Sequence, residues 1–174
     1  MLVTNDNLTI RDAVESDATQ LGTWWRDGKV MAHAGFPNGL PITNDEIIKN
    51  LATGTDEKGR VLIIEVDSFP VGEMSYFNVG DSTAEIGIKI CDFNMQEKGH
   101  GTCFIRMLIN ALFVNHGFER IILDTNLKNV RAQHTYEKIG FRKTGERIDC
   151  WEDQLGVPQS VVDFELTKSE YISE

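Results

Sequence analysis

Cysteine, proline, cationic residues and long apolar runs are all scarce in this chain of 174 residues. Its three cysteines, Cys91, Cys103 and Cys150, form no CxxC pair, which excludes a disulfide framework and a thiolate zinc site. No apolar run approaches the ~20 residues that cross a bilayer, and the polar N-terminus lacks the apolar segment of a secretory signal. We therefore expect a cytoplasmic protein without membrane association, whose three free thiols pack as small buried hydrophobes.

Positive charge is outnumbered, because 17 Lys and Arg stand against 27 Asp and Glu, a net charge of −10. This balance excludes a general nucleic-acid binder, which needs a basic face to displace counterions from phosphates. A negative field attracts cations, so the charge is compatible with a cationic substrate, although solubility alone explains it equally well. The length is typical of one domain, and we expect residues 1–174 to form it.

The hydrophobic pattern predicts a mixed α/β domain. Apolar alternation or continuity predicts strands at 8–11, 61–66, 71–77, 84–90 and 121–123, with a closing pair from 141 onward and at 156–166. Helical spacing predicts helices from 17 to 27, after a capping box of Thr43 and Glu46, from 99 or 101 to 117, and from 129 to 140. The buried helix between the strands 84–90 and 121–123 makes a βαβ unit, which implies one parallel pair among hairpins.

The segment 96–102, with the sequence Gln-Glu-Lys-Gly-His-Gly-Thr, joins a predicted strand to the buried helix. Gly99 and Gly101 let the backbone approach a ligand closely, and the helix behind them presents free N–H groups and a partial positive charge. These features suit a phosphate or pyrophosphate, with an ordinary strand-to-helix turn as the alternative. A P-loop does not fit because its lysine is absent, and a Rossmann fingerprint does not fit because Phe104 replaces its third glycine.

A second polar constellation lies on the helix predicted after residue 129. Asn129 and Tyr136 are seven residues apart, so they lie two turns apart on nearly the same side of a helix. A polar cap and a phenol can then face one groove. The alternative is an N-cap asparagine and an ordinary core tyrosine.

The two motifs together, Q-x-x-G-x-G at 96–101 and N-x-x-A-x-x-x-Y-E-K-x-G-F at 129–141, resemble those of the GCN5-related N-acetyltransferase (GNAT) superfamily. Gly72-Glu73 in one predicted strand and Glu85-Ile86-Gly87 in the next make the sequence similar to the ribosomal-protein-alanine acetyltransferase-like branch. That branch also includes aminoglycoside and polyamine acetylators. The resemblance implies a mostly antiparallel sheet with a splayed parallel pair and helices on both faces. It also implies an acetyl-CoA-dependent N-acetyltransferase without a metal, or alternatively a non-catalytic acyl-CoA-binding domain on the same fold.

The resemblance also implies where acetyl-CoA binds. Its pantetheine would pair with the strand at Lys89, Ile90 and Cys91, and Asn129 would hydrogen-bond the pantetheine or the acetyl end. The pyrophosphate would lie on backbone N–H groups of the loop formed by Gln96, Glu97, Lys98, Gly99, His100, Gly101 and Thr102. An acidic residue at position 97 departs from the family pattern, and it is compatible with this site only if its side chain points away from the phosphates.

The catalytic residues implied by the resemblance are Tyr136 and a carboxylate. Tyr136 matches the tyrosine near the sulfur. Its reference pKa of about 10 exceeds that of a thiol, ~8.5, so a hydrogen bond to the developing thiolate is at least as favourable as full proton transfer. Asp124, at the end of a strand, and Glu85, on the pantetheine strand, are the two candidates for the general base, with a water molecule as the third.

The resemblance implies that the acceptor is a primary amine, either of a protein N-terminus or of a small molecule such as a polyamine or an aminoglycoside, and the sequence does not distinguish between these. The family builds its acceptor pocket from the first helices, which suggests Trp25 and His33 as acceptor-binding residues. A second copy of the chain is a further source of residues for this pocket, so a homodimer is compatible with the sequence, as is a monomer.

Overall fold

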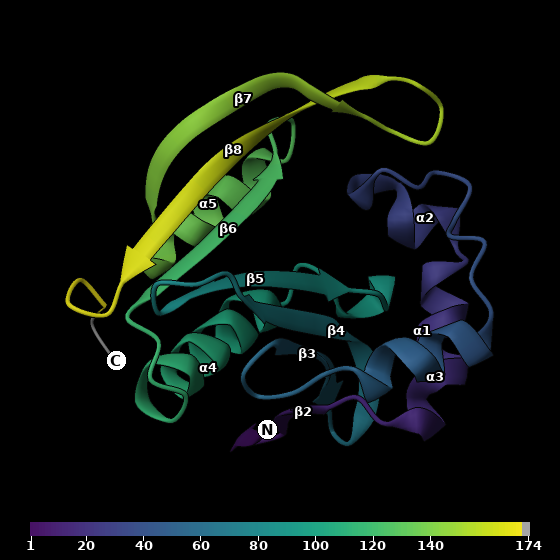
Figure 1. Ribbon diagram of the computed structural model, residues 1–174, viewed down its shortest axis with the longest axis horizontal. Helices are drawn as coiled ribbons and strands as arrows, with labels where there is room; N and C mark the ends of the chain where they lie inside the picture. Colours follow the sequence, from purple (N-terminus) through teal and green to yellow (C-terminus); the bar gives the residue numbers. More distant parts are fainter. Residues whose placement is uncertain (172–174) are drawn as a thin grey trace.

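One sheet runs through the part of the chain that the computed structural model describes, residues 1–171 (Figure 1). Its eight strands have the order β1-β2-β3-β4-β5-β6-β8-β7, and only β5 and β6 run parallel within it. The strands are β1 (Leu2–Asn5), β2 (Leu8–Asp12), β3 (Gly59–Val66), β4 (Phe69–Asn78), β5 (Thr83–Ile90), β6 (Arg120–Asn126), β7 (Arg142–Glu152) and β8 (Pro158–Thr167). The predicted mostly antiparallel sheet with one parallel pair is confirmed.

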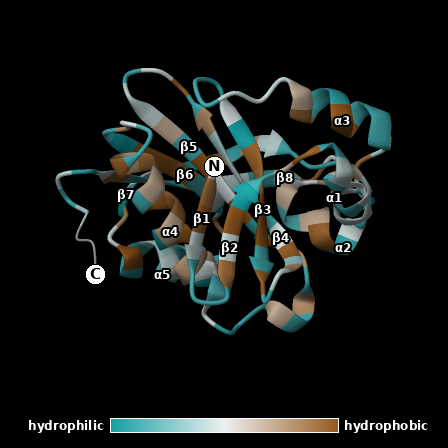
Figure 2. Cartoon of the chain, turned by 90° about the horizontal axis from the view of Figure 1, so that it is seen from below, coloured by the Kyte–Doolittle hydropathy of each residue, from teal (hydrophilic) through white to brown (hydrophobic). Residues whose placement is uncertain are grey.

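Helices cover both faces of this sheet, as predicted. The α-helices are α1 (Ala18–Trp25), α2 (Gly28–Met31), α3 (Asn44–Ala52), α4 (His100–Val114) and α5 (Val130–Ile139), and the 3₁₀ turns are η1 (Glu15–Asp17), η2 (Ala32–Ala34) and η3 (Phe93–Met95). Alternate residues of β3 define the two faces: Leu62 and Ile64 belong to the core under α4 and α5, whereas Ile63 packs against α1 and α3. Figure 2 shows hydrophobic colour along β2 and β3, whereas the turns are hydrophilic.

The parallel pair separates soon after it forms. Residues Thr83–Glu85 of β5 pair with Arg120–Ile122 of β6, and the register ends there. β5 continues to Ile90 beside β4, and β6 continues to Asn126 beside β8. The sheet therefore opens between β5 and β6, and Figure 1 shows the two strands diverging there.

Some expectations about the outer parts of the fold were wrong. The sequence pattern predicts no strand before residue 8, yet residues Leu2–Asn5 form β1 by pairing with β2. The helix expected to run to residue 27 ends at Trp25, and α2 begins after Asp27, whose side chain accepts a hydrogen bond from the Lys29 N–H. Among the described residues, no helix is both long and apolar enough to cross a membrane.

The expectation of three buried cysteines holds for one of them. Cys91 is buried, whereas Cys103 and Cys150 are exposed. Cys103 lies in the first turn of α4, which is open to solvent, and Cys150 lies on β7, the outermost strand of the sheet. Residues 172–174, which the single-domain prediction includes, lie outside the described residues.

Candidate active site

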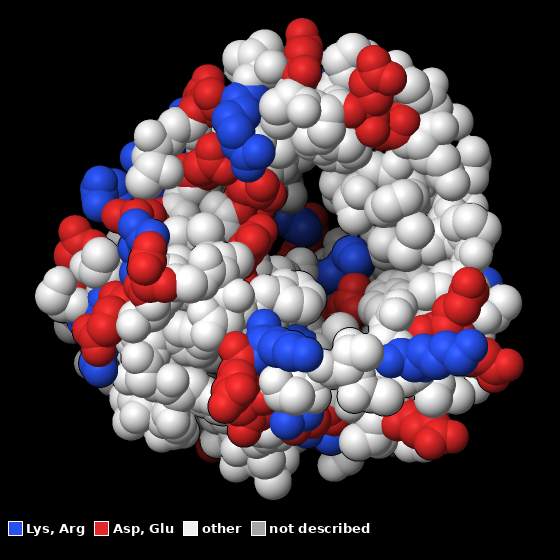
Figure 3. All heavy atoms as spheres, viewed as in Figure 1, with Lys and Arg blue, Asp and Glu red and all other residues white. Residues whose placement is uncertain are grey.

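A cleft of about 900 Å³ occupies the gap between β5 and β6. Its walls come from the α2–η2 segment, β5, η3 and the loop before α4, the first turns of α4, β6, α5, β7 and β8. Figure 3 shows it as a deep hollow near the centre of the face viewed, with both acidic and basic side chains at its rim. The splay of the parallel pair therefore places the two sequence motifs on one cavity.

The glycine-containing loop enters α4 through a left-handed backbone. Gly99 is the N-cap with φ +82°, and Glu97 also has a positive φ of +63°. Within residues 1–171, none of the backbone N–H groups at 97–101 donates to an acceptor, whereas the Thr102 N–H already donates to Gly99 O at 3.1 Å. A Cβ added at Gly101 would meet no atom within 4 Å. The loop thus offers free donors and open space, which fits a phosphate group; Thr102 contributes no free backbone donor.

The acidic side chain of the loop is neutralised from α5. Glu97 forms an ion pair of 2.8 Å with Arg131, and both side chains are largely exposed. The positive charge of Arg131, which lines the cleft, compensates this departure from the family pattern. Lys98 and His100 are not among the residues that line the cleft, so the structure does not bring these two predicted residues to its wall.

The start of the glycine-containing loop is hydrogen-bonded to the end of β5. Gln96 donates from Nε2 to Ile90 O at 2.9 Å, which ties the loop to the strand. Of the three residues expected to pair with the pantetheine, Lys89 and Ile90 line the cleft, whereas Cys91 lies behind it, with its N–H donating to Val71 O at 2.8 Å. Burial, and secondarily the charge of Glu73, raises the pKa of the Cys91 thiol to about 12.

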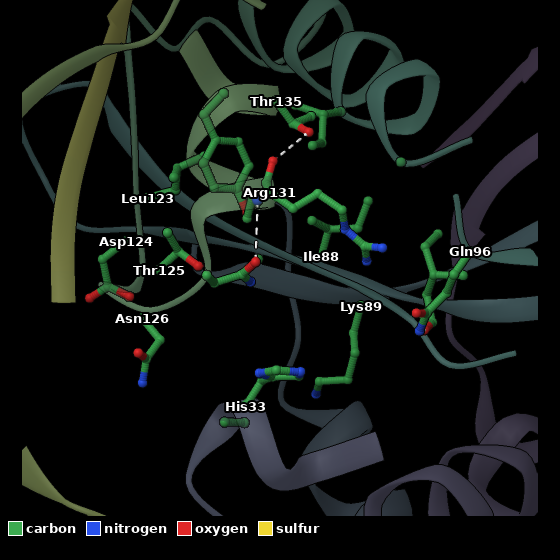
Figure 4. A pocket seen from close by; sticks show the side chains of 18 of the residues that line it. His33, Ile88, Lys89, Gln96, Leu123, Asp124, Thr125, Asn126, Arg131 and Thr135 are labelled. Atoms are coloured by element: carbon green, nitrogen blue, oxygen red, sulfur yellow. Dashed lines mark hydrogen bonds between the residues drawn. The ribbon is translucent and has the colours of Figure 1, made fainter. Parts of the chain in front are cut away.

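Glu73, which sequence reasoning missed, connects two predicted residues. Lys89 Nζ lies 2.9 Å from Glu73 Oε1, and Trp25 Nε1 donates to Glu73 Oε2 at 2.8 Å. Trp25 does not line the cleft but anchors Glu73, which fixes Lys89. His33 does line it, and Figure 4 shows the Lys89 side chain extending toward the His33 ring.

Asn129 and Tyr136 both face the cleft from α5. Asn129 Oδ1 caps the helix by accepting from Ala132 N at 3.2 Å, and its Nδ2 group has no partner among the described residues. Tyr136 is 8% exposed and packs against Phe141 and Phe164, with ring centroids 6.0 and 5.6 Å away. Burial, and secondarily the negative charge of Asp124, raises the pKa of Tyr136 to about 12.

The two candidate carboxylates have different positions. Asp124 lines the cleft and forms an ion pair of 2.7 Å with Arg147 on β7. Figure 4 shows Asp124 and Asn126 at one end of the cleft and Gln96 at the other. Glu85 is exposed on β5 and is not among the lining residues, so the structure does not bring it to the site.

The β7–β8 hairpin borders the cleft with Arg147 and Trp151 and contacts the segment after α2. Trp151 lies so near Gly35 that a Cβ there would come within 2.3 Å of its ring. The Gln154 N–H donates to Gly35 O at 2.8 Å, and its side chain bonds the backbone of Asn38 (2.9 Å) and Gly39 (3.1 Å). We call these contacts, between 35–39 and 151–154, the hairpin clasp. No local signal in the sequence indicates them, because the partners are more than a hundred residues apart.

Comparisons with known proteins agree with this geometry. The model of the acetyltransferase (GNAT) domain matches residues 7–142. An aminoglycoside N(6')-acetyltransferase type 1 from Klebsiella pneumoniae is 25% identical over 178 residues, which cover 95% of this chain and 89% of that protein. A protein of the same name from Serratia marcescens is 25% identical over 154 residues, covering 81% and 77%.

Solved structures of acetyltransferases share the fold. A probable acetyltransferase superposes with a TM-score of 0.85 at 24% identity, covering 98% of this chain and 99% of that one. A spermidine N-acetyltransferase from Vibrio cholerae, in complex with CoA and spermine, also gives a TM-score of 0.85, at 21% identity and with coverage of 96% and 99%. With the family match over most of its length and both motifs on one cleft, the chain belongs to the GNAT family of acetyltransferases.

Proposed function

We propose that this enzyme acetylates a primary amine of a small cationic molecule, such as a polyamine or an aminoglycoside, with acetyl-CoA as donor. The observation that carries the proposal is one cleft that is lined both by Glu97, Gly99 and Gly101, whose backbone N–H groups are free, and by Asn129, Tyr136 and Asp124. The named relatives, which act on aminoglycosides or spermidine, support a small-molecule acceptor. A protein N-terminus, the acceptor of the ribosomal-protein-alanine branch, is the alternative.

The donor end is assigned from the residues that offer unpaired polar groups. The pyrophosphate lies on the N–H groups of 97–101, and the Nδ2 group of Asn129 is free to hold the pantetheine or acetyl carbonyl. Lys89 and Ile90 border the groove where the pantetheine runs along β5. Acetyl-CoA supplies an acyl thioester, which an amine attacks with loss of the thiol.

Tyr136 acts as a hydrogen-bond donor to the departing sulfur. With its pKa at about 12, full proton transfer to a thiolate of reference pKa ~8.5 is uphill by about 3.5 units, or ~5 kcal/mol. The tyrosine therefore keeps its proton and stabilises the developing negative charge. The ring contacts with Phe141 and Phe164 hold its hydroxyl in place.

Asp124 is the carboxylate at the acceptor end. It borders the cleft within electrostatic range of Tyr136, and we assign it to the incoming amine, whose proton it takes directly or through solvent. Glu85 receives no role because it lies outside the cleft. His33 borders the acceptor space, whereas Trp25 acts only indirectly, because it holds Glu73, which in turn fixes Lys89.

The experiment is a measurement of free-thiol release from acetyl-CoA with a panel of spermidine, an aminoglycoside and a peptide with a free N-terminus. We expect turnover with one of the two small amines and at most weak turnover with the peptide. Turnover confined to the peptide would overturn the acceptor class. Stoichiometric CoA binding without turnover on any amine would favour the non-catalytic acyl-CoA-binding domain.

A further inference from the structure

Two carboxylates are neighbours across the sheet at the end of the cleft where Asp124 lies, and of the two only Asp124 lines the cleft. Asp124 on β6 and Asp163 on β8 are directly paired in the antiparallel register. Like charges in this arrangement repel and destabilise a sheet. A cation is therefore needed beside them.

Arg147, on β7, supplies that cation. Its Nη2 lies 2.7 Å from Asp124 Oδ2 and 2.7 Å from Asp163 Oδ1, and its Nε donates to Asp163 Oδ2 at 2.9 Å. The attachment is unequal, since Asp163 receives a bidentate contact and Asp124 a single one. The hydrogen bond to Asp163, ahead of that to Asp124, raises the pKa of Arg147, which keeps the guanidinium charged.

The charges of this cluster do not cancel. Two carboxylates and one guanidinium leave a net charge of −1 where Asp124 borders the cleft. Asp124 Oδ1 has no hydrogen bond within residues 1–171, so one oxygen stays available to a ligand. Because Arg147 holds Asp163 with two hydrogen bonds, it can release Asp124 without becoming unpaired.

We propose that Asp124 forms the subsite for a protonated amino group of the acceptor, and that Arg147, held by Asp163, is its internal placeholder. In the absence of the acceptor, Arg147 bridges both carboxylates. When the acceptor binds, its ammonium takes the place of Arg147 at Asp124, and Arg147 stays on Asp163. Arg147 is thus a specificity-determining residue. It weakens the binding of a cationic acceptor, which has to displace it from Asp124, and it excludes an uncharged acceptor from Asp124, because such a molecule cannot replace the guanidinium charge. The inference rests on the proposed function and names the charge of its acceptor.

The test is the binding of spermidine to the CoA-bound protein, followed by titration calorimetry, which needs no turnover. Arg147→Met removes the competing charge, so we expect Kd to fall about threefold to fivefold, the range of a half-exposed ion pair. Asp124→Asn should raise Kd at least tenfold. In the Asp124→Asn background, Arg147→Met should no longer tighten binding, because the carboxylate that the two cations share is gone.

Two further variants complete the design. Arg142 lies on the same strand as Arg147 and pairs with Glu165, away from Asp124. The control variant Arg142→Met should therefore leave the Kd for spermidine unchanged. Arg147→Lys keeps the charge but not the bidentate fork, so its Kd should lie between those of the wild type and Arg147→Met. The half-exposed Arg147 is not a core residue, so these variants are expected to fold, which circular dichroism checks.

An unchanged or weaker affinity in Arg147→Met would overturn the placeholder. The same holds for tightening that persists in the Asp124→Asn background. The failure of the proposed function looks different: spermidine would bind with this dependence on Arg147, yet no amine would release thiol from acetyl-CoA. Turnover without any effect of Arg147 on Kd would remove the placeholder and leave the enzyme activity intact.

Discussion

At the scale of single residues, the burial of Tyr136 determines whether its hydroxyl acts as an acid or as a hydrogen-bond donor. A phenol surrounded by Phe141 and Phe164 loses solvation of its anion, which raises its pKa. The same environment strengthens a hydrogen bond from the neutral hydroxyl, because the surroundings have a low dielectric constant. The tyrosine is thus a poor proton source and a good hydrogen-bond donor.

Tyr136→Phe should lower kcat about 10- to 100-fold and leave the KM for acetyl-CoA nearly unchanged, because the hydroxyl acts on the departing sulfur. Deprotonation of Tyr136 would remove the hydrogen bond to the sulfur and lower kcat. Because its pKa is about 12, we expect no such decrease in kcat below pH ~11. Steady-state kinetics of thiol release measure both quantities. Tyr76→Phe, in the core and away from the cleft, is the matched control. An unchanged kcat would remove the hydroxyl from the mechanism.

At the scale of elements, local sequence signals located most helices and strands. The capping box forms as predicted, with Thr43 Oγ1 accepting from Glu46 N at 3.3 Å and the Glu46 carboxylate from Thr43 N at 2.8 Å. Asn129 caps α5, and Gly140 ends it at φ +118°. Such signals are readable because both partners lie within four residues of one another.

The parts of the site that the sequence did not predict come from distant contacts. Arg147 and Asp124 are 23 positions apart in the sequence. The strand of Arg147, β7, is exposed on both faces, so no alternation of apolar and polar residues indicates which of its side chains point toward the cleft. Glu73 was visible only as a strand residue, because its role depends on the register that sets it opposite Lys89. Register between strands is a tertiary property, which single-sequence periodicity does not encode.

Gly101→Ala tests the loop at the start of α4. Alanine is favoured over glycine in a helix by about 1 kcal/mol, and a Cβ here meets nothing within 4 Å, so the protein alone should be as stable as before or more stable. A phosphate lying on the backbone would meet the new methyl group, and we expect the KM for acetyl-CoA to rise at least ~10-fold. Thermal melts and steady-state kinetics measure the two effects.

Gly145→Ala is the control, because its Cβ is also unobstructed and it lies outside the cleft. A normal KM for acetyl-CoA in Gly101→Ala would show that no phosphate approaches the backbone at this turn.

At the scale of the whole molecule, the charge of −10 has to coexist with a polyanionic ligand. The loop solves this with backbone donors, whose partial charges do not depend on side-chain composition. Arg131, paired with Glu97 at the cleft, cancels the negative charge that this loop side chain would otherwise add. The negative charge at the other end, around Asp124, remains available to a cationic acceptor.

The stability of the whole fold should fall in alkaline solution through Cys91. Burial, and secondarily Glu73, raises its pKa from 9.0 to about 12. Because the folded pKa is the higher one, the thiol's contribution is complete below pH 9 and is lost as the pH rises to 12, by ~4 kcal/mol in total. Urea unfolding from pH 8 to pH 11 should therefore show a weaker pH dependence in Cys91→Ala than in the wild type. Cys103→Ala, which removes an exposed thiol, should keep the wild-type slope, and equal slopes in all three proteins would contradict the assignment.

The hairpin clasp also has a consequence for the order of folding. Its partners, 35–39 and 151–154, enclose more than a hundred residues of chain, so forming it early would cost a large loop-closure entropy. Once the sheet between them has formed, the loop that remains to be closed is short, and the clasp becomes a late step. Since its hydrogen bonds lie near the surface, it is also among the first contacts to open in local unfolding. We therefore expect the cleft wall beside the β7–β8 hairpin to be the last part of the cleft to assemble and the first to lose its contacts in local unfolding.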